Sequence, residues 1–187
     1  MNTVYDIKTR VLDERYIEEH QQKIFTAWKN VWKDTEWGEE EYFTFSDSIG
    51  YIRDLANHGT AISVEIGDQI ISFIIFAVDY FPKPKSPEEA SIYAEVHKRL
   101  TKPTYLYEFA TAPEYRGKGI GSMMMDEMEQ QVKKDGSDGL FAWTRKMSKS
   151  LSMYEKRGFT IVGELTVPKE NKVGYEKRVY LLKTLVK

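Results

Sequence analysis

The sequence predicts an α/β or α+β sandwich built around one mixed β-sheet, and three observations support this fold class. Two β-rich segments are separated by the tight turn Gly67-Asp68, which is typical of a hairpin. The second half of the chain runs in the order strand, glycine-rich turn, helix, strand, helix, strand. Amphipathic helical patterns surround these segments. Because helices and sheets must bury their apolar faces against one another, this order predicts helices packed on a single sheet.

The first third of the chain predicts one strand and two helices. We expect a strand at Thr3–Ile7. Asp13 suits the N-cap of a helix from Glu14 to Lys33, because apolar side chains recur there at helical spacing. Ser46 is predicted to begin a short helix that ends near Asn57.

The hairpin strands are expected at Ala61–Ile66 and Gln69–Tyr80. Both faces of the second strand are apolar, which places it in the centre of the sheet. After a proline-containing loop, Ser86-Pro87-Glu88-Glu89 forms a capping box with proline at the first helical position. It predicts a helix to about Leu100, which is a candidate lid or dimer contact and leaves a homodimer open.

The remaining elements follow the same logic of periodicity and turn residues. They are a strand at Tyr105–Thr111, a turn at Arg116–Gly121, an amphipathic helix from Ile120 to Gly136 with Met124 and Met128 in the core, a strand at Leu140–Thr144, a helix at Ser148–Arg157, and closing strands at Phe159–Val167 and Tyr175–Leu185.

Composition excludes several classes of protein. The 187 residues suit a single domain over residues 1–187, and the formal net charge of −2 argues against a nucleic-acid partner. The chain has no cysteine, which excludes disulfides, zinc–thiolate sites and a cysteine nucleophile. The three histidines lie far apart, so we expect no metal site. Because no apolar run resembles a leader or a membrane span, we expect a cytoplasmic protein without a membrane partner.

The segment from Tyr105 to Ser122 is the most informative about function. Three glycines at alternate positions, Gly117, Gly119 and Gly121, let the backbone turn sharply before a helix begins. Such a turn directs backbone N–H groups outward from a helix N-terminus, which favours an anion. Arg116 and Lys118 add positive charge. A dinucleotide fingerprint and a turn without a ligand remain alternatives, whereas the Walker phosphate loop is excluded because its string is absent.

Two motifs together carry a resemblance to a known family. Arg116-Gly117-Lys118-Gly119-Ile120-Gly121 resembles the Arg/Gln-x-x-Gly-x-Gly/Ala signature of the GNAT family of N-acetyltransferases. Further along, Tyr154-Glu155-Lys156-Arg157-Gly158-Phe159 resembles the second signature of that family, although Met147 and Ser150 stand where Asn and Ala are usual. The resemblance covers roughly Leu106 to Gly163. It implies a mixed, twisted, mostly antiparallel sheet whose fourth and fifth strands splay apart around coenzyme A.

The resemblance also implies a set of binding residues for acetyl-CoA as co-substrate. The pyrophosphate is expected on the backbone amides of the turn, and the pantetheine arm on the main chain of the preceding strand. These residues are Arg116, Gly117, Lys118, Gly119, Ile120, Gly121 and Ser122 for the pyrophosphate, and Phe109, Ala110 and Thr111 for the pantetheine.

The function implied is transfer of an acetyl group from acetyl-CoA to a primary amine of a small molecule or peptide. With no cysteine to carry the acyl group, direct transfer in a ternary complex is favoured. Glu108 is the first candidate for the general base and Glu114 the second, while Tyr154 is the candidate acid for the departing thiolate. The alternative function is a non-catalytic acetyl-CoA sensor or regulatory module.

The acceptor site is expected near the first helices. Residues 28–45 interleave Trp28, Trp32, Trp37, Tyr42, Phe43 and Phe45 with Glu36, Glu39, Glu40 and Glu41. Aromatic walls with carboxylates suit a cationic amine. The alternative is that Trp28 and Trp32 belong to the core, as aromatic residues at helical spacing usually do.

Overall fold

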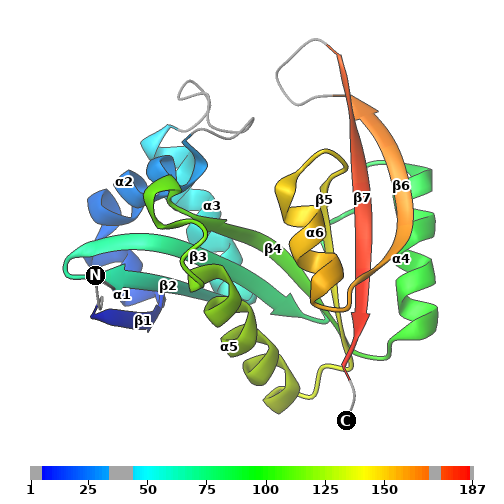
Figure 1. Cartoon of the computed structure of the whole chain (residues 1–187), viewed down its shortest axis with the longest axis horizontal. Coiled ribbons are helices and arrows are strands. Elements are labelled where there is room, and N and C mark those ends of the chain that lie inside the picture. Colours follow the sequence, from blue (N-terminus) through cyan, green and yellow to red (C-terminus); the bar gives the residue numbers. More distant parts are fainter. Residues whose placement is uncertain (1–5, 34–43, 169–173, 186–187) are drawn as a thin grey trace. The chain divides into compact units, whose positions relative to one another are not determined.

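The computed structural model describes residues 6–33, 44–168 and 174–185. Within these residues, strands form one seven-stranded sheet in the order β1-β2-β3-β4-β5-β7-β6 (Figure 1). The elements in chain order are β1 (Ile7–Val11), α1 (Glu14–Glu19), α2 (Gln21–Trp32), α3 (Phe45–His58), β2 (Thr60–Ile66), β3 (Gln69–Val78), α4 (Pro87–Arg99), β4 (Pro103–Thr111), the 3-10 helix η2 (Pro113–Tyr115), α5 (Ile120–Lys134), β5 (Gly139–Arg145), α6 (Lys149–Lys156), β6 (Thr160–Pro168) and β7 (Tyr175–Thr184).

The predicted mixed, mostly antiparallel sheet is confirmed. Strands β4 and β5 pair in parallel, from Pro103 opposite Gly139 to Tyr105 opposite Phe141. The pairs β1–β2, β2–β3, β5–β7 and β6–β7 are antiparallel. The hairpin prediction is also confirmed, and β3 lies inside the sheet as its two apolar faces indicated.

Two predictions for the first part of the chain were wrong in detail. The helix expected from Glu14 to Lys33 is broken at His20, whose φ of −126° leaves the helical range. The imidazole of His20 stacks on the ring of Tyr16 with the centroids 4.1 Å apart. The first strand begins at Ile7 and ends at Val11, downstream of the expected Thr3–Ile7, because its register is set by pairing with β2. Residues 3–5 lie outside the described part of the chain.

The chain divides into two compact units, which are described separately. The first comprises residues 1–77 and 107–131, and the second comprises residues 78–106 and 132–187. A single domain over residues 1–187 therefore stays a prediction from the sequence. None of the helices in the described ranges is long and apolar enough to cross a membrane.

The core of the first unit is formed by α1, α2 and α3 with the strands of the hairpin. Trp28 is only 2% exposed and makes edge-to-face contacts with Trp32, Tyr51 and Phe73 at centroid distances of 5.8, 6.1 and 5.8 Å. Trp28 is therefore a core residue, in agreement with the interpretation that the aromatic pattern belongs to the core. Asp13 caps α1 as predicted, accepting a hydrogen bond from the N–H of Tyr16.

The core of the second unit lies between α4 and the strands β5 and β7. Phe141 and Tyr180 are fully buried, and Phe81 stacks on Phe141 with the centroids 5.4 Å apart. α4 begins at the predicted cap Ser86 and packs against β6 (Figure 1). The buried carboxylate of Glu89 accepts hydrogen bonds from the Lys85 N–H at 2.6 Å and from the hydroxyl of Tyr180 at 2.8 Å.

Candidate functional site

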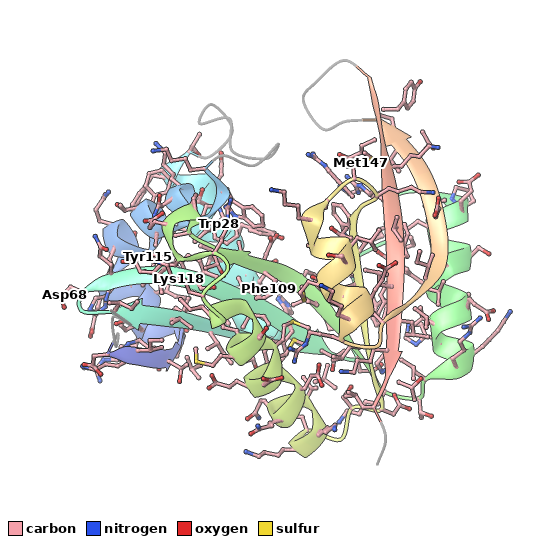
Figure 2. The ribbon with its side chains drawn as sticks, in the orientation of Figure 1. Trp28, Asp68, Phe109, Tyr115, Lys118 and Met147 are labelled. Carbon is pink, nitrogen blue, oxygen red and sulfur yellow. The ribbon has the colours of Figure 1, made fainter. Side chains whose placement is uncertain are left out.

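The turn between β4 and α5 has the backbone conformation that its glycines suggested. Gly117 and Gly119 have φ values of 72° and 84°, in the left-handed region that favours glycine. A Cβ atom added at either position would meet nothing within 4 Å, so the backbone conformation rather than packing calls for glycine here. Figure 2 shows Tyr115 and Lys118 on this turn. The turn is exposed to solvent from residue 116 to residue 119.

The start of α5 presents backbone N–H groups that no carbonyl in the described part of the chain accepts. The first hydrogen bond of the helix runs from the N–H of Met123 to the carbonyl of Gly119, at 3.0 Å. The N–H groups of Ile120, Gly121 and Ser122 precede it and have no backbone acceptor among the residues that the structure describes. These donors add to the positive end of the helix dipole, so this end of α5 is suited to an anion.

A close contact with β4 fixes the position of this helix start. A Cβ atom added at Gly121 would lie 3.1 Å from Cζ of Phe109, so the Phe109 ring packs directly against the α5 backbone. Figure 2 shows Phe109 on β4. Met124, Met125 and Met128 are fully buried along α5, which confirms the core position predicted for Met124 and Met128. The donors of the helix start are thus held on a rigid support.

The main chain and the side chain of Arg116 both donate hydrogen bonds to carbonyl groups of the protein. Its N–H donates to the carbonyl of Pro113 at 3.2 Å. Its Nε donates to the carbonyl of Thr111 at 2.8 Å, and its Nη2 donates to the carbonyls of Val31 and Lys33 at 3.0 and 3.4 Å. The guanidinium therefore ties the turn to the C-terminal end of α2, where carbonyls lack helical partners. Its role toward pyrophosphate stays a prediction.

Lys118 keeps a positive charge on the turn. Its Nζ lies 5.2 Å from the centroid of the Tyr115 ring, which is within the range of a cation–π contact. Lys118 is exposed, so its positive charge is accessible to an anion from solvent.

The strand residues expected at the pantetheine arm are held from β3. The buried Ser72 Oγ donates to the carbonyl of Ala110 at 2.7 Å and lies 2.8 Å from Oγ1 of Thr111. The N–H of Ala112 donates to the carbonyl of Ile71 at 2.8 Å. In a trans peptide the C=O and the following N–H point in opposite directions. The N–H of Thr111 is therefore directed away from Ser72.

The two candidate bases have different partners. Glu108 on β4 is half-buried and accepts a 2.6 Å hydrogen bond from the hydroxyl of Tyr51 on α3. Glu114 is exposed and accepts a 3.0 Å hydrogen bond from Nδ2 of Asn30. The pKa of Glu114 is lowered, first by its own backbone N–H and then by Asn30. A lowered pKa weakens Glu114 as a base.

Tyr154 lies on α6 in the second unit. It is only 5% exposed, and its ring makes an edge-to-face contact with Phe159 at 5.1 Å. Gly158 follows the helix with a φ of 83°, and the Phe159 N–H donates to the carbonyl of Tyr154 at 3.1 Å. The Tyr-x-x-x-Gly-Phe pattern thus forms a packed helix end.

The two departures from the second signature lie in different environments. Met147 is 92% exposed, before α6 begins (Figure 2). Ser150 Oγ lies 2.7 Å from Oγ1 of Thr144 at the end of β5. Ser150 therefore holds the first turn of α6 to the strand, so its hydroxyl has a structural use of its own.

Most residues of the predicted acceptor site lie outside the described part of the chain, namely Glu36, Trp37, Glu39, Glu40, Glu41, Tyr42 and Phe43. Sequence reasoning missed Tyr51, Ser72 and Asn30. None of the three belongs to a local motif, and each meets its partner only after distant elements come together.

Comparison with known proteins agrees with the fold and the motifs. The acetyltransferase (GNAT) family model matches residues 15–159. A comparison with curated proteins finds no match. An N-acetyltransferase of Staphylococcus aureus Mu50 is 17% identical and has a TM-score of 0.69, with coverage of 96% of this chain and 98% of that one.

Two ribosomal-protein acetyltransferases share the fold as well. The ribosomal-protein-S18-alanine N-acetyltransferase of Escherichia coli is 11% identical with a TM-score of 0.63, covering 95% of this chain and 93% of that one. The ribosomal-protein-alanine N-acetyltransferase of Brucella melitensis is 14% identical with a TM-score of 0.65, covering 95% of this chain and 99% of that one. The family model spans more than half of the residues of this chain, so the chain belongs to the GNAT family of acetyltransferases.

Proposed function

We propose that this protein is an N-acetyltransferase that moves the acetyl group of acetyl-CoA to a primary amine of a small molecule or peptide. The observation that carries the proposal is the group of N–H donors at Ile120, Gly121 and Ser122, which have no backbone acceptor within residues 6–33, 44–168 and 174–185 and follow a turn with positive φ at Gly117 and Gly119. Membership in the GNAT family supports an acetyl group as the cargo.

The turn fits the pyrophosphate of coenzyme A. The open space around Gly117 and Gly119 leaves room for an anion to approach the backbone. Lys118 supplies a positive charge, and the exposed Ser122 adds a hydroxyl. The proposed binding residues are those of the turn, Arg116 to Ser122, with Phe109, Ala110 and Thr111 of β4 for the pantetheine arm.

The proposed chemistry is direct transfer in a ternary complex. The amine nitrogen attacks the thioester carbonyl carbon, so a C–N bond forms and the C–S bond breaks. An alkyl ammonium has a pKa of about 10, so a base must take its proton before attack. We assign this role to Glu108, and the N–H of Thr111 is the proposed donor to the carbonyl oxygen. Tyr154 is the proposed acid that protonates the leaving thiolate, and the second proton that the nitrogen loses as the C–S bond breaks restores the phenol.

Release of free thiol tests the proposal directly. Because the chain has no cysteine, a thiol reagent reports only coenzyme A. The acceptor panel contains polyamines, amino acids, aminoglycosides and peptides, including peptides with an N-terminal alanine because two structural relatives are alanine acetyltransferases. We expect turnover with at least one primary amine. Tight coenzyme A binding without turnover on any amine favours the acetyl-CoA sensor instead.

The variant Tyr154→Phe separates catalysis from binding. If Tyr154 is the acid, kcat falls while the calorimetric affinity for coenzyme A is kept, since the ring still packs on Phe159. Equal kcat in both proteins removes Tyr154 from the mechanism. The homodimer and the cytoplasmic location stay predictions from the sequence.

A further inference from the structure

The hydroxyl of Tyr51 and the carboxylate of Glu108 form a short hydrogen bond between two elements that are far apart in sequence. The Tyr51 Oη to Glu108 Oε1 distance is 2.6 Å, and the residues lie 57 positions apart, on α3 and β4. A phenol has an unperturbed pKa near 10, so it is the donor and the carboxylate the acceptor over the working pH range. The bond therefore favours the ionised form of Glu108.

The Tyr51 ring is fixed while part of it stays open to solvent. Its edge-to-face contact with the buried Trp28 has a centroid distance of 6.1 Å. Tyr51 is nevertheless 41% exposed. The ring is thus anchored to the core of the first unit on one side and presents a polar tip to Glu108 on another. This arrangement fixes the direction of the Glu108 carboxylate at low entropic cost.

A neutral donor suits a carboxylate that has to take up a proton. The phenol orients Glu108 without cancelling its negative charge, and a carboxylate has about four acceptor positions, so it can bind a cationic amine as well. A second tyrosine–glutamate pair in the same unit provides a control. Tyr16 donates to the buried Glu65 at 2.7 Å, but Lys23 and Arg10 also contact that carboxylate at 3.2 and 3.3 Å. That carboxylate is neutralised by cations and serves stability.

We propose that Tyr51 is a positioning residue that holds Glu108 ionised and aimed at the ammonium group of the acceptor. This inference rests on the proposed function. During the reaction the ammonium gives one proton to Glu108, which yields a neutral amine and a carboxylic acid, while Tyr51 keeps its own proton. The acceptor class that this pair recognises is therefore a protonated primary amine.

The test is the pH dependence of kcat/KM in Tyr51→Phe, with Tyr16→Phe as the matched control. Both substitutions remove one phenol–carboxylate hydrogen bond and keep the ring. A hydrogen bond worth about 0.5–1.5 kcal/mol converts to a shift of about 0.4–1.1 pH units. We expect the acidic limb of Tyr51→Phe to move upward by that amount, with the KM for acetyl-CoA within about twofold. Tyr16→Phe should lower the unfolding temperature and leave the pH dependence of kcat/KM unchanged.

A carboxyl titration that needs no turnover complements the kinetics. With carbon-13 in the glutamate carboxyls, the Glu108 signal is assigned from its loss in Glu108→Gln and followed across pH in both tyrosine variants. An upward shift of its midpoint only in Tyr51→Phe supports the inference, and an unchanged midpoint overturns it. If the wild-type protein acetylates no amine, the proposed function fails, and the titration still decides whether Tyr51 controls the ionisation of Glu108.

Discussion

The hydroxyl of Ser72 on β3 donates a 2.7 Å hydrogen bond to the carbonyl of Ala110 on β4. This bond sets the plane of the peptide between Ala110 and Thr111, and with it the direction of the Thr111 N–H. A side chain that no motif contains thus controls a backbone donor in the strand proposed to bind the pantetheine arm.

Ser72→Ala is expected to lower both stability and kcat. It leaves buried polar groups with fewer partners, at a cost of about 1–2 kcal/mol. We expect kcat to fall by about three- to tenfold, because a donor that is less firmly held stabilises the transition state less well. Urea unfolding and steady-state kinetics measure the two effects.

Ser63→Ala is the matched control for this prediction. Ser63 lies on the neighbouring strand β2 and is fully buried, and its Oγ has no hydrogen-bond partner in the part of the chain that the structure describes. Its removal should change stability by less than about 0.5 kcal/mol and leave kcat alone. Equal effects of the two substitutions would contradict a specific role for Ser72.

Gly119→Glu is expected to abolish coenzyme A binding. Because a Cβ atom has space at this position, the loss should come from the φ of 84° and from a carboxylate beside the pyrophosphate. The control is Gly67→Glu in the β2–β3 turn, where φ is 57° and a Cβ also meets nothing within 4 Å. Calorimetry should find normal affinity in the control. Normal affinity in Gly119→Glu would remove the turn from the binding site.

Stability is expected to fall in acid because of Glu65. Burial acts to raise the pKa of Glu65, but hydrogen bonds from Tyr16 and Lys23 outweigh it, so the folded pKa is lowered. A lowered folded pKa contributes stability above the unfolded pKa, near 4.5, which is lost as pH falls through the folded value. Urea unfolding of wild type and Glu65→Gln should differ by about 1–3 kcal/mol at pH 7, and the difference should shrink below about pH 4.5. A pH-independent difference would contradict this.

Glu89→Gln is expected to destabilise the second unit. The amide keeps only one acceptor oxygen, so its NH₂ group faces either the Lys85 N–H, which bonds Oε2, or the Tyr180 hydroxyl, which bonds Oε1. A buried mismatch of this kind costs about 1–3 kcal/mol. Glu95→Gln on the same helix removes only a solvent-exposed ion pair with Arg99, and should leave the unfolding temperature nearly unchanged. Thermal unfolding compares the two variants, and equal shifts would be the contrary result.

Most of the elements could be predicted because their signals are local. The caps at Asp13 and Ser86, the turn at Gly67-Asp68 and the glycines around α5 act within a few residues. The break at His20 could not be predicted in this way. The helical spacing continues through it, and the ring of His20 settles against Tyr16 only in the folded chain. β1 was misplaced for a similar reason, since pairing with β2 sets its register.

In the candidate site, too, local features could be predicted from the sequence and contacts between distant elements could not. The motif located the turn and the start of α5, because the glycines that adopt positive φ lie within a short and recognisable stretch of sequence. The partners Tyr51 and Ser72 are contributed by elements that precede β4 by many residues, and hydroxyl groups occur throughout the chain. Only the folded structure shows which of them meet Glu108 and Ala110.

Arg116 has a consequence for engineering. Its guanidinium donates hydrogen bonds to Val31 at the end of α2 and to Thr111 at the end of β4. One cation therefore links α2, β4 and the turn that carries Arg116. Substitutions near either segment should be epistatic with any change at Arg116. A designer who grafts the glycine turn onto another scaffold would therefore need to transplant the last turn of α2 along with it.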